Sequence, residues 1–292
     1  MNGFLNLLKP PGMTSSDAVV AVRRTLAGEK TGHAGTLDPE AAGVLPIMIG
    51  KAARLFDVLA DKEKEYIAEI CMGCATDTQD AQGTVTHTGA WKGDWQVLRD
   101  AMPALTGESL QTPPQYSALK VGGKPAYRLA RGGETAQLAP RPVRVDAIEF
   151  LEATGPDTAL LRIACGRGVY VRTLCHDLGA RAGCPAHMRF LLRTRTGAFC
   201  LEDAVTLEEW MAAEDRSALL TPLDAPIRHL PRADVAARFA GACRNGAAMQ
   251  SFEALDEGAR EGGPVRVYCG GVFAGLARWR EGALRFQAML MD

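Results

Sequence analysis

The stretch GHAGTLDP at residues 32–39 limits the possible folds of this chain more than any other feature. Gly32 and Gly35 can adopt backbone angles that are closed to other residues, and the proline that ends the stretch fixes its own φ. The apolar run 44–49 follows and predicts a buried strand. We therefore expect a tight, stiff loop between core elements, with Asp38 held in place near its end.

Asp38 is the single acid of this loop, and its residue type allows two interpretations. A short acid readily accepts hydrogen bonds from nearby backbone N–H groups, so on local chemistry alone a turn-capping role is the simpler interpretation. An acid held between core elements can also serve a purpose beyond local structure. The rest of the chain has to separate these two interpretations.

Length and composition indicate a globular protein with one large core. The chain has 292 residues, 47% of them hydrophobic, which is enough for that core and a small additional domain. Its apolar runs are too short to cross a bilayer, and its first ten residues lack a basic leader and a cleavage site. We therefore expect a soluble protein of the cytoplasm.

The eight cysteines are irregularly spaced, which indicates reduced thiols rather than a disulfide scaffold. Cys71 and Cys74 form the one C-x-x-C of the chain. A zinc site needs further ligands, and the sequence has no second pair, so we predict two strand residues and no bound metal. A Walker loop and a dinucleotide fingerprint are also missing, so we expect no cofactor.

The charges are unevenly distributed, although the net charge of −1 by itself argues against a nucleic-acid-binding protein. Residues 120–195 hold 13 Lys and Arg against 6 Asp and Glu, whereas residues 201–224 hold 7 acids and one Arg. Tyr116, Tyr127 and Tyr170 lie in or beside the basic segment. Arginines with interleaved aromatic residues are typical of phosphate contact and base stacking, and an ordinary solvated surface is the alternative.

Apolar periodicity and turn residues predict a mixture of strands and helices. Strands are expected at 4–8, 44–49, 64–70, 159–165 and around 187–195. Helices are expected from Asp17 or a preceding serine to Leu26, at 51–59, from near 171 to 183, and at 206–213. A small β unit should follow, with strands at 265–269, 272–279 and 283–290 and a helix at 235–243.

Several motifs in the first 225 residues resemble those of the TruB family of tRNA pseudouridine synthases. The segment GHAGTLDPEAAGVLP matches every fixed position of that family's nucleophile loop. Further matches are LLKPPGMTS, KEY, TDTQDAQG, QTPPQYSALK and CGRGVYVRTLCHDLG. Leu8, in the first of these, stands where the family usually has Asp.

The resemblance implies an α+β fold. Residues 1–225 would form the catalytic domain around a large mixed, mainly antiparallel sheet, and residues 226–292 a small β-rich, PUA-like domain that binds RNA. The implied reaction isomerises uridine 55 in the T loop of tRNA to pseudouridine on a flipped-out base and needs no cofactor. The implied partner is the T arm of tRNA, with no membrane, no obligatory protein partner and a monomeric state.

The resemblance also assigns roles to single residues. Asp38 matches the nucleophile, Tyr66 the tyrosine placed against the target base, and Arg172 the arginine that pairs with the catalytic acid and favours its ionised form. Residues expected to bind or position substrate are His33, Gly35, Thr36, Leu37, Lys120, Tyr170, Leu191 and Arg193. Without the resemblance, Tyr66 is equally well an aromatic residue of a sheet, and His33 a turn histidine.

Two other functions stay open at this point. The chain can be an RNA-binding or tRNA-folding module that performs no chemistry, or a pseudouridine synthase that acts on a different or guide-selected RNA. Binding alone does not need a held acid, and an acid near phosphates weakens binding. The pair of Asp38 and Arg172 therefore favours the enzyme.

Overall fold

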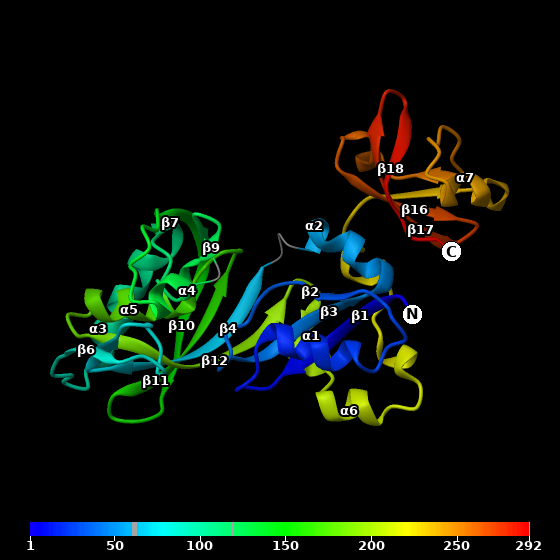
Figure 1. Cartoon of the computed structure of the whole chain (residues 1–292). Helices are drawn as coiled ribbons and strands as arrows, with labels where there is room; N and C mark the ends of the chain where they lie inside the picture. Colours follow the sequence, from blue (N-terminus) through cyan, green and yellow to red (C-terminus); the bar gives the residue numbers. More distant parts are fainter. Residues whose placement is uncertain (60–62, 118, 292) are drawn as a thin grey trace.

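The computed structural model describes residues 1–59, 63–117 and 119–291, whose strands gather into one large sheet and one smaller one (Figure 1). The strands of the large sheet are β1 (Gly3–Lys9), β2 (Thr31–His33), β3 (Ala42–Ile49), β4 (Lys64–Met72), β7 (Gly107–Gln111), β10 (Arg141–Ala153), β11 (Thr158–Cys165), β12 (Ala186–Thr196) and β13 (Phe199–Cys200). The order is β1-β3-β12-β4-β11-β10-β7, with β2 on β3 and β13 on β12. Only the contact between β12 and β3 is parallel among the described pairs of this sheet. The predicted α+β class with a mixed, mainly antiparallel sheet is therefore confirmed.

Helices cover the large sheet. They are α1 (Ser15–Arg23), α2 (Phe56–Leu59), α3 (Trp95–Ala101), α4 (Ala126–Arg131), α5 (Val171–Arg181) and α6 (Leu207–Ala212), with the 3₁₀ turns η1 (Gly50–Leu55), η2 (Met102–Leu105), η3 (Leu201–Asp203), η4 (Arg216–Leu219) and η5 (Ala225–Ile227). α5 packs against β12 and β4, and α3 packs against α5. Val22 of α1, Leu178 of α5 and Trp210 of α6 share one buried cluster with the sheet residues Leu45 and Ile70. This main core fixes α5 relative to the strands.

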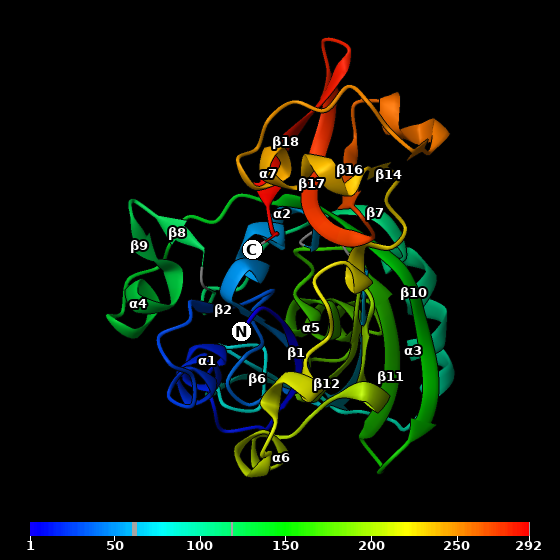
Figure 2. The ribbon, with the colours of Figure 1, turned by 90° about the vertical axis from the view of Figure 1, so that its right-hand side faces the viewer.

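Two short hairpins extend from the large sheet. The first joins β5 (Cys74–Thr76) to β6 (Val85–Thr88), and the second joins β8 (Lys120–Val121) to β9 (Lys124–Pro125) and leads into α4. Figure 2 shows β8, β9 and α4 projecting to one side of the molecule. Lys120 is exposed on this projection.

The smaller sheet closes the chain. It has the order β15-β14-β16-β17-β18, formed by β14 (Arg232–Val235), β15 (Ala254–Leu255), β16 (Pro264–Cys269), β17 (Val272–Arg280) and β18 (Ala283–Met289), together with η6 (Ala237–Phe239), α7 (Ala240–Arg244) and η7 (Glu257–Arg260). Ile227, Leu276 and Leu290 pack with Phe4 and Val44 of the large sheet in a shared buried cluster. Apolar packing therefore joins the two sheets, and the division at residue 225 stays a prediction.

The strands at 4–8, 44–49, 64–70, 159–165 and 187–195 were predicted close to their observed bounds, whereas the limits of several helices were wrong. α1 is capped by Thr14, since Asp17 occupies the third helical position and completes a capping box with it. The same helix ends at Arg23 instead of Leu26, because the N–H and the hydroxyl of Thr25 both bond to the carbonyl of Val22 and tighten the chain into a turn.

The helix expected at 235–243 begins later. Val235 ends β14, whose residues alternate between exposed and buried positions and pair in parallel with β16. A strand periodicity of two over these residues therefore outweighs the helical tendency of the alanines that follow. At residues 51–59, the expected helix is a 3₁₀ turn, η1, followed by one turn of α-helix, α2. Among the described residues, we find no helix that is both long and apolar enough to span a membrane.

Gly43 sits where β3 meets β12 and depends on having no side chain. Its φ is +113°, and a Cβ atom there would overlap the carbonyl oxygen of Arg193, its partner in the parallel pair. Gly183, after α5, also has a positive φ, of +71°, but a Cβ there would meet no atom within 4 Å.

We predict that Gly43→Ala lowers the free energy of unfolding by at least about 2 kcal/mol, because backbone strain and a steric clash add together. Urea unfolding monitored by circular dichroism measures this loss. Gly183→Ala is the matched control and should lose clearly less, since it carries strain alone. Equal losses in the two variants would show that β12 tolerates a side chain at Gly43.

Candidate active site

Asp38 and Arg172 form a two-point ion pair between the loop that precedes β3 and the start of α5. Asp38 lies in the loop between β2 and β3, and Arg172 lies in the first turn of α5. Arg172 Nε is 2.8 Å from Asp38 Oδ2, and Nη2 donates to Oδ1 at 3.2 Å. The Arg172 side chain is 4% exposed and that of Asp38 is 36% exposed. The carboxylate is thus held from the protein side and open on the other.

The remaining donors of Arg172 are also occupied. Nη1 donates to the carbonyl of Thr78 at 3.1 Å and lies 3.4 Å from Asp80 Oδ2, and Nη2 donates to the carbonyl of Tyr116 at 3.1 Å. A planar guanidinium with partners in every direction has one orientation. Arg172 therefore presents a fixed surface to Asp38.

Burial raises the pKa of the Asp38 carboxyl above its ordinary value. The Arg172 guanidinium opposes this shift, and the negative charge of Asp80 adds to it. We expected Arg172 to favour the ionised form of Asp38, and it does lower the pKa of that carboxyl. The effect of burial is larger, so the pKa is raised overall. A raised pKa in an accessible carboxyl beside a buried arginine is typical of catalytic acids and bases.

Ser15 and Lys9 hold the loop of Asp38 from the side of α1 and β1. The hydroxyl of Ser15 accepts from the N–H of Leu37 at 2.8 Å and donates to the Leu37 carbonyl at 3.0 Å. Lys9 Nζ donates to the carbonyl of Pro39 at 2.9 Å and also bonds two carbonyls of the chain after β1. Lys9 is fully buried, and that burial lowers its pKa to about 8. The loop is therefore anchored on both sides of Asp38.

The side chain of Arg193, in β12, also bonds the backbone of this loop. Its Nε donates to the carbonyl of Val44 at 2.7 Å, and Nη1 and Nη2 donate to the carbonyls of Thr36 and Gly35 at 3.3 and 3.2 Å. Arg193 is fully buried. Expected from the sequence as a substrate-binding residue, it bonds the loop itself, and we infer that it positions the loop.

Tyr66 and Leu191 line the core side of the site. Tyr66 lies opposite Arg193 in the pairing of β4 with β12, and Leu191 follows on the same face of β12 opposite Ala68. Both side chains are buried in the main core. Burial raises the pKa of the Tyr66 phenol, so the hydroxyl is protonated at neutral pH. An aromatic ring and an apolar side chain beside an open carboxylate suit a planar base.

His33 begins the loop that carries Asp38, and Tyr170 lies near the ion pair. The N–H of Gly35 donates to His33 Nδ1 at 3.4 Å, and burial together with the charge of Arg193 lowers the pKa of His33 and favours the neutral ring. Tyr170 precedes Arg172, and its backbone N–H and carbonyl both bond the side chain of Gln111. Of the sequence-predicted residues, only Lys120 lies away from this group, on the projecting hairpin.

Sequence reasoning missed four residues that shape the site: Lys9, Ser15, Asp80 and Gln111. Lys9 and Ser15 belong to a matched motif, but their partners Pro39 and Leu37 lie 30 and 22 residues away in the chain. Asp80 lies in a matched motif and accepts from the N–H of Gln82 within its own turn. Its second role as a partner of Arg172 depends on tertiary structure.

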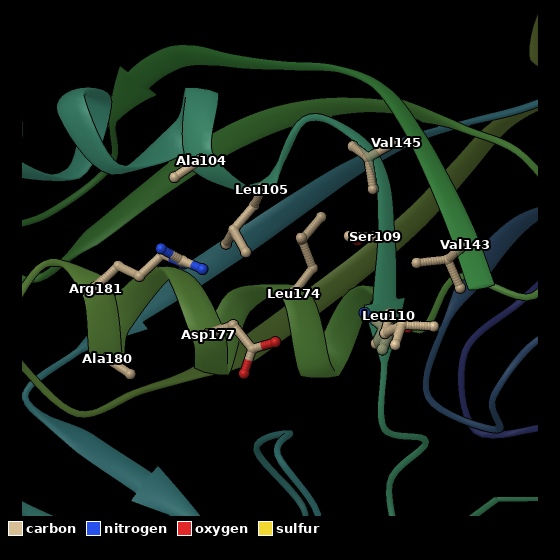
Figure 3. Close-up of a pocket in the computed structure, with 11 residues that line it drawn as sticks. Ala104, Leu105, Ser109, Leu110, Val143, Val145, Leu174, Asp177, Ala180 and Arg181 are labelled. Atoms are coloured by element: carbon tan, nitrogen blue, oxygen red, sulfur yellow. The ribbon is translucent and has the colours of Figure 1, made fainter. Parts of the chain in front are cut away.

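A separate cavity of about 460 Å³ lies behind α5, lined by residues of η2, β7, β10 and α5 (Figure 3). In Figure 3, Leu174 of α5 extends toward Ser109 and Val145, whereas the carboxyl of Asp177 points away from them. Asp38, Tyr66 and Arg172 do not line this cavity. The cavity is therefore separate from the ion pair.

Comparison with known proteins gives matches over most of the chain. The model of the TruB family pseudouridylate synthase N-terminal domain matches residues 23–171, and that of the tRNA pseudouridylate synthase B C-terminal domain matches residues 172–228. A protein named tRNA pseudouridine synthase B from Heliobacterium modesticaldum is 43% identical over 85% of this chain and 82% of its own length. One of the same name from Azoarcus sp. is 39% identical over 98% of this chain and 93% of its own length.

Two solved structures share the fold. One is described as an H/ACA RNP bound to a substrate RNA containing 2'-deoxyuridine, with 26% identity and a TM-score of 0.74 over 99% of this chain and 85% of that chain. The other is a Cbf5-Nop10-Gar1 complex, with 28% identity and a TM-score of 0.72 over 99% of this chain and 84% of that chain.

We predict that Ser15→Ala lowers the free energy of unfolding by about 1–3 kcal/mol, because it leaves the N–H and carbonyl of buried Leu37 without their partner. Thermal or urea unfolding measures the loss. Ser16→Ala is the matched control, since Ser16 is exposed in the same helical turn and should change stability by less than about 0.5 kcal/mol. A Ser15 variant as stable as the Ser16 variant would remove this anchor from the description of the loop.

Proposed function

Since this chain belongs to the TruB family of tRNA pseudouridine synthases, we propose that the uridine it isomerises is residue 55 in the T loop of tRNA and that Asp38 is the nucleophile. One observation carries the second part of this proposal. Asp38 is held by a buried arginine through two contacts while its carboxylate stays open on the other side. A structural ion pair has no need of that open side.

The reaction rearranges one nucleotide without adding or removing atoms. The C–N bond between ribose and uracil breaks, the base rotates, a C–C bond forms to the same ribose carbon, and a proton moves from the ring carbon to the ring nitrogen. The Asp38 carboxylate acts either on the uracil ring or at the sugar, and both routes require its ionised form. Arg172 fixes the direction of attack by orienting both carboxylate oxygens.

The neighbouring residues suit a flipped base. We expect the flipped base to contact Tyr66 and Leu191, whose side chains are almost fully buried in the free protein, and the protonated phenol of Tyr66 can donate or relay a proton. Neutral His33 lies beside the loop, where it can fill the space that the extruded base leaves in the RNA. The basic segment 120–195, which includes exposed Lys120, provides cations for phosphate contacts with the T arm.

We further propose that residues 1–225 act as the catalytic unit, that the small sheet of residues 226–292 adds RNA contacts, and that the protein works as a monomer without a protein partner. The Cbf5-Nop10-Gar1 complex is an assembly of a solved relative, and we do not transfer it to this chain. A tRNA substrate places the reaction in the cytoplasm. The purified chain should then modify an unmodified tRNA transcript with no other component, and an activity that needed a guide RNA or a second protein would contradict this.

Asp38→Asn separates the nucleophile from a structural role. Asparagine keeps the size of the side chain, and Asp80 still gives Arg172 a countercharge, so we expect a folded variant. It should bind tRNA at least as tightly as the parent, because one negative charge near the RNA is gone, yet form no detectable pseudouridine. Filter binding and chemical mapping of pseudouridine in a tRNA transcript measure both quantities, with a uridine 55→cytidine transcript as the substrate control.

Two results would contradict this proposal in different ways. Pseudouridine formed at the parent rate by Asp38→Asn would remove Asp38 from the chemistry. Pseudouridine at another uridine, or none in the parent on tRNA, would remove the choice of position 55 and leave the role of Asp38 to be tested on the RNA that is modified.

The pH dependence of the rate provides a separate test. The single-turnover rate should fall as the pH drops through the raised pKa of Asp38, since only the carboxylate is active. Asp80 raises that pKa, so Asp80→Asn should move the acidic limb to lower pH. Asp77→Asn, in the same hairpin, is the matched control and should leave the limb in place. An acidic limb that does not move in Asp80→Asn would mean that a different group titrates.

A further inference from the structure

Cys71, Cys74 and His187 bring three metal-binding side chains together. Cys71 lies near the end of β4, Cys74 begins β5, and His187 lies directly opposite Cys71 in the pairing of β4 with β12. Their ligand atoms all lie within 4.8 Å of one another, and Cys74 Sγ is 3.5 Å from His187 Nδ1. The sequence indicated only the two cysteines. The third ligand, His187, lies 113 residues after Cys74 in the chain and comes close to it only in the folded protein.

The spacing fits a tetrahedral metal with sulfur and nitrogen ligands. Zinc bonds to thiolate at about 2.3 Å and to imidazole at about 2.1 Å, which places neighbouring ligand atoms about 3.6 Å apart in a tetrahedron. The separation of Cys74 Sγ from His187 Nδ1 is 3.5 Å, close to this value, and all three ligand atoms lie within 4.8 Å of one another. Thiolate and imidazole ligands select zinc over magnesium or calcium.

We propose that Cys71, Cys74 and His187 bind one Zn²⁺ ion, with the fourth position open to water. The cysteines are half-buried and His187 is buried, so an ion can enter from the sulfur side. In the metal-free protein, His187 Nδ1–H donates to the carbonyl of Cys74 at 3.0 Å. The bound form exchanges this bond for the metal, with the ring proton on Nε2.

Two thiolates neutralise the charge of the ion, and Asp157 adds negative charge near Cys71. A cysteine binds zinc as its thiolate, so binding releases a proton and the affinity rises with pH.

The position of the site assigns it a structural role. Cys74 opens the hairpin that carries Thr78 and Asp80, the two residues of this hairpin that bond Arg172. The same hairpin joins β12 where the N–H of Met188 donates to the carbonyl of Gln79 at 3.0 Å. A zinc ion would connect β4, β5 and β12 at the base of this hairpin. It takes no part in the reaction and stabilises the fold around Arg172.

The test uses the full-length protein, stripped of metal by a chelator and kept reduced by a phosphine. Zn²⁺ is titrated in competition with a chromophoric chelator, and Co²⁺ is added separately as a spectroscopic probe. We expect one Zn²⁺ per chain with sub-micromolar affinity, and intense visible bands of tetrahedral thiolate-bound Co²⁺ that Zn²⁺ bleaches. The midpoint of thermal unfolding should rise with added Zn²⁺.

Two substitutions with matched controls locate the site. Cys74→Ser and His187→Gln should each weaken Zn²⁺ binding by more than about 100-fold, a loss beyond that of an outer-shell partner. Cys200→Ser, a half-buried cysteine elsewhere, and His87→Gln, an exposed histidine of β6, should bind as the parent does.

Either of two results would overturn the proposal. One is a parent protein that binds less than one equivalent of Zn²⁺, or whose Co²⁺ bands lack thiolate character. This measurement does not depend on the folding of any variant. The other is Cys74→Ser binding Zn²⁺ as tightly as Cys200→Ser, which would place the ion at a different site.

Discussion

The structure around the active site depends on one buried guanidinium. An arginine removed from water is costly unless every donor finds a partner, and Arg172 is 4% exposed. Its partners come from distant parts of the chain, namely the loop of Asp38, the hairpin of Thr78 and Asp80, and the segment of Tyr116. Burial of the Arg172 guanidinium is tolerated only because these segments lie together around it. Together they also fix the position of Asp38. The same desolvation that requires the partners also raises the pKa of Asp38.

Preorganisation of the loop is the second consequence. Backbone groups on both sides of Asp38 are bonded by side chains from β1, α1 and β12, so the carboxylate cannot move far without breaking buried hydrogen bonds. Two of these side chains, Lys9 and Arg193, are cations that the fold buries completely. They are held by main-chain carbonyls in place of carboxylates, which leaves Asp38 free to react.

Much of this arrangement follows from the sequence, and the exceptions share a cause. Periodicity of apolar residues gave the strands that carry Tyr66 and Leu191, and motif resemblance paired Asp38 with Arg172. Lys9, Ser15 and Asp80 were missed because each acts on a partner that only tertiary structure brings near, and Ser and Asp are also common in turns. The direction of the Asp38 pKa was missed for the same reason, since desolvation depends on packing. The resemblance assigned Arg193 to substrate binding, whereas its burial under the loop depends on the packing of β12 against β3.

The pairing of β4 with β12 links the active site to the cysteine and histidine cluster. Tyr66 and Cys71 are five residues apart and so face opposite sides of β4, whereas their partners Arg193 and His187 are six apart and in a regular strand would share one side. A bulge between Met188 and Phe190 resolves this conflict, because the extra residue, Arg189, lets both pairs stand opposite each other. Without the bulge, one of the two pairs would be out of register by one residue, and its side chain on β12 would point to the opposite face of the sheet. A contact that fixes Cys71 against His187 therefore also limits slippage of Tyr66 against Arg193, on the other face of the same two strands.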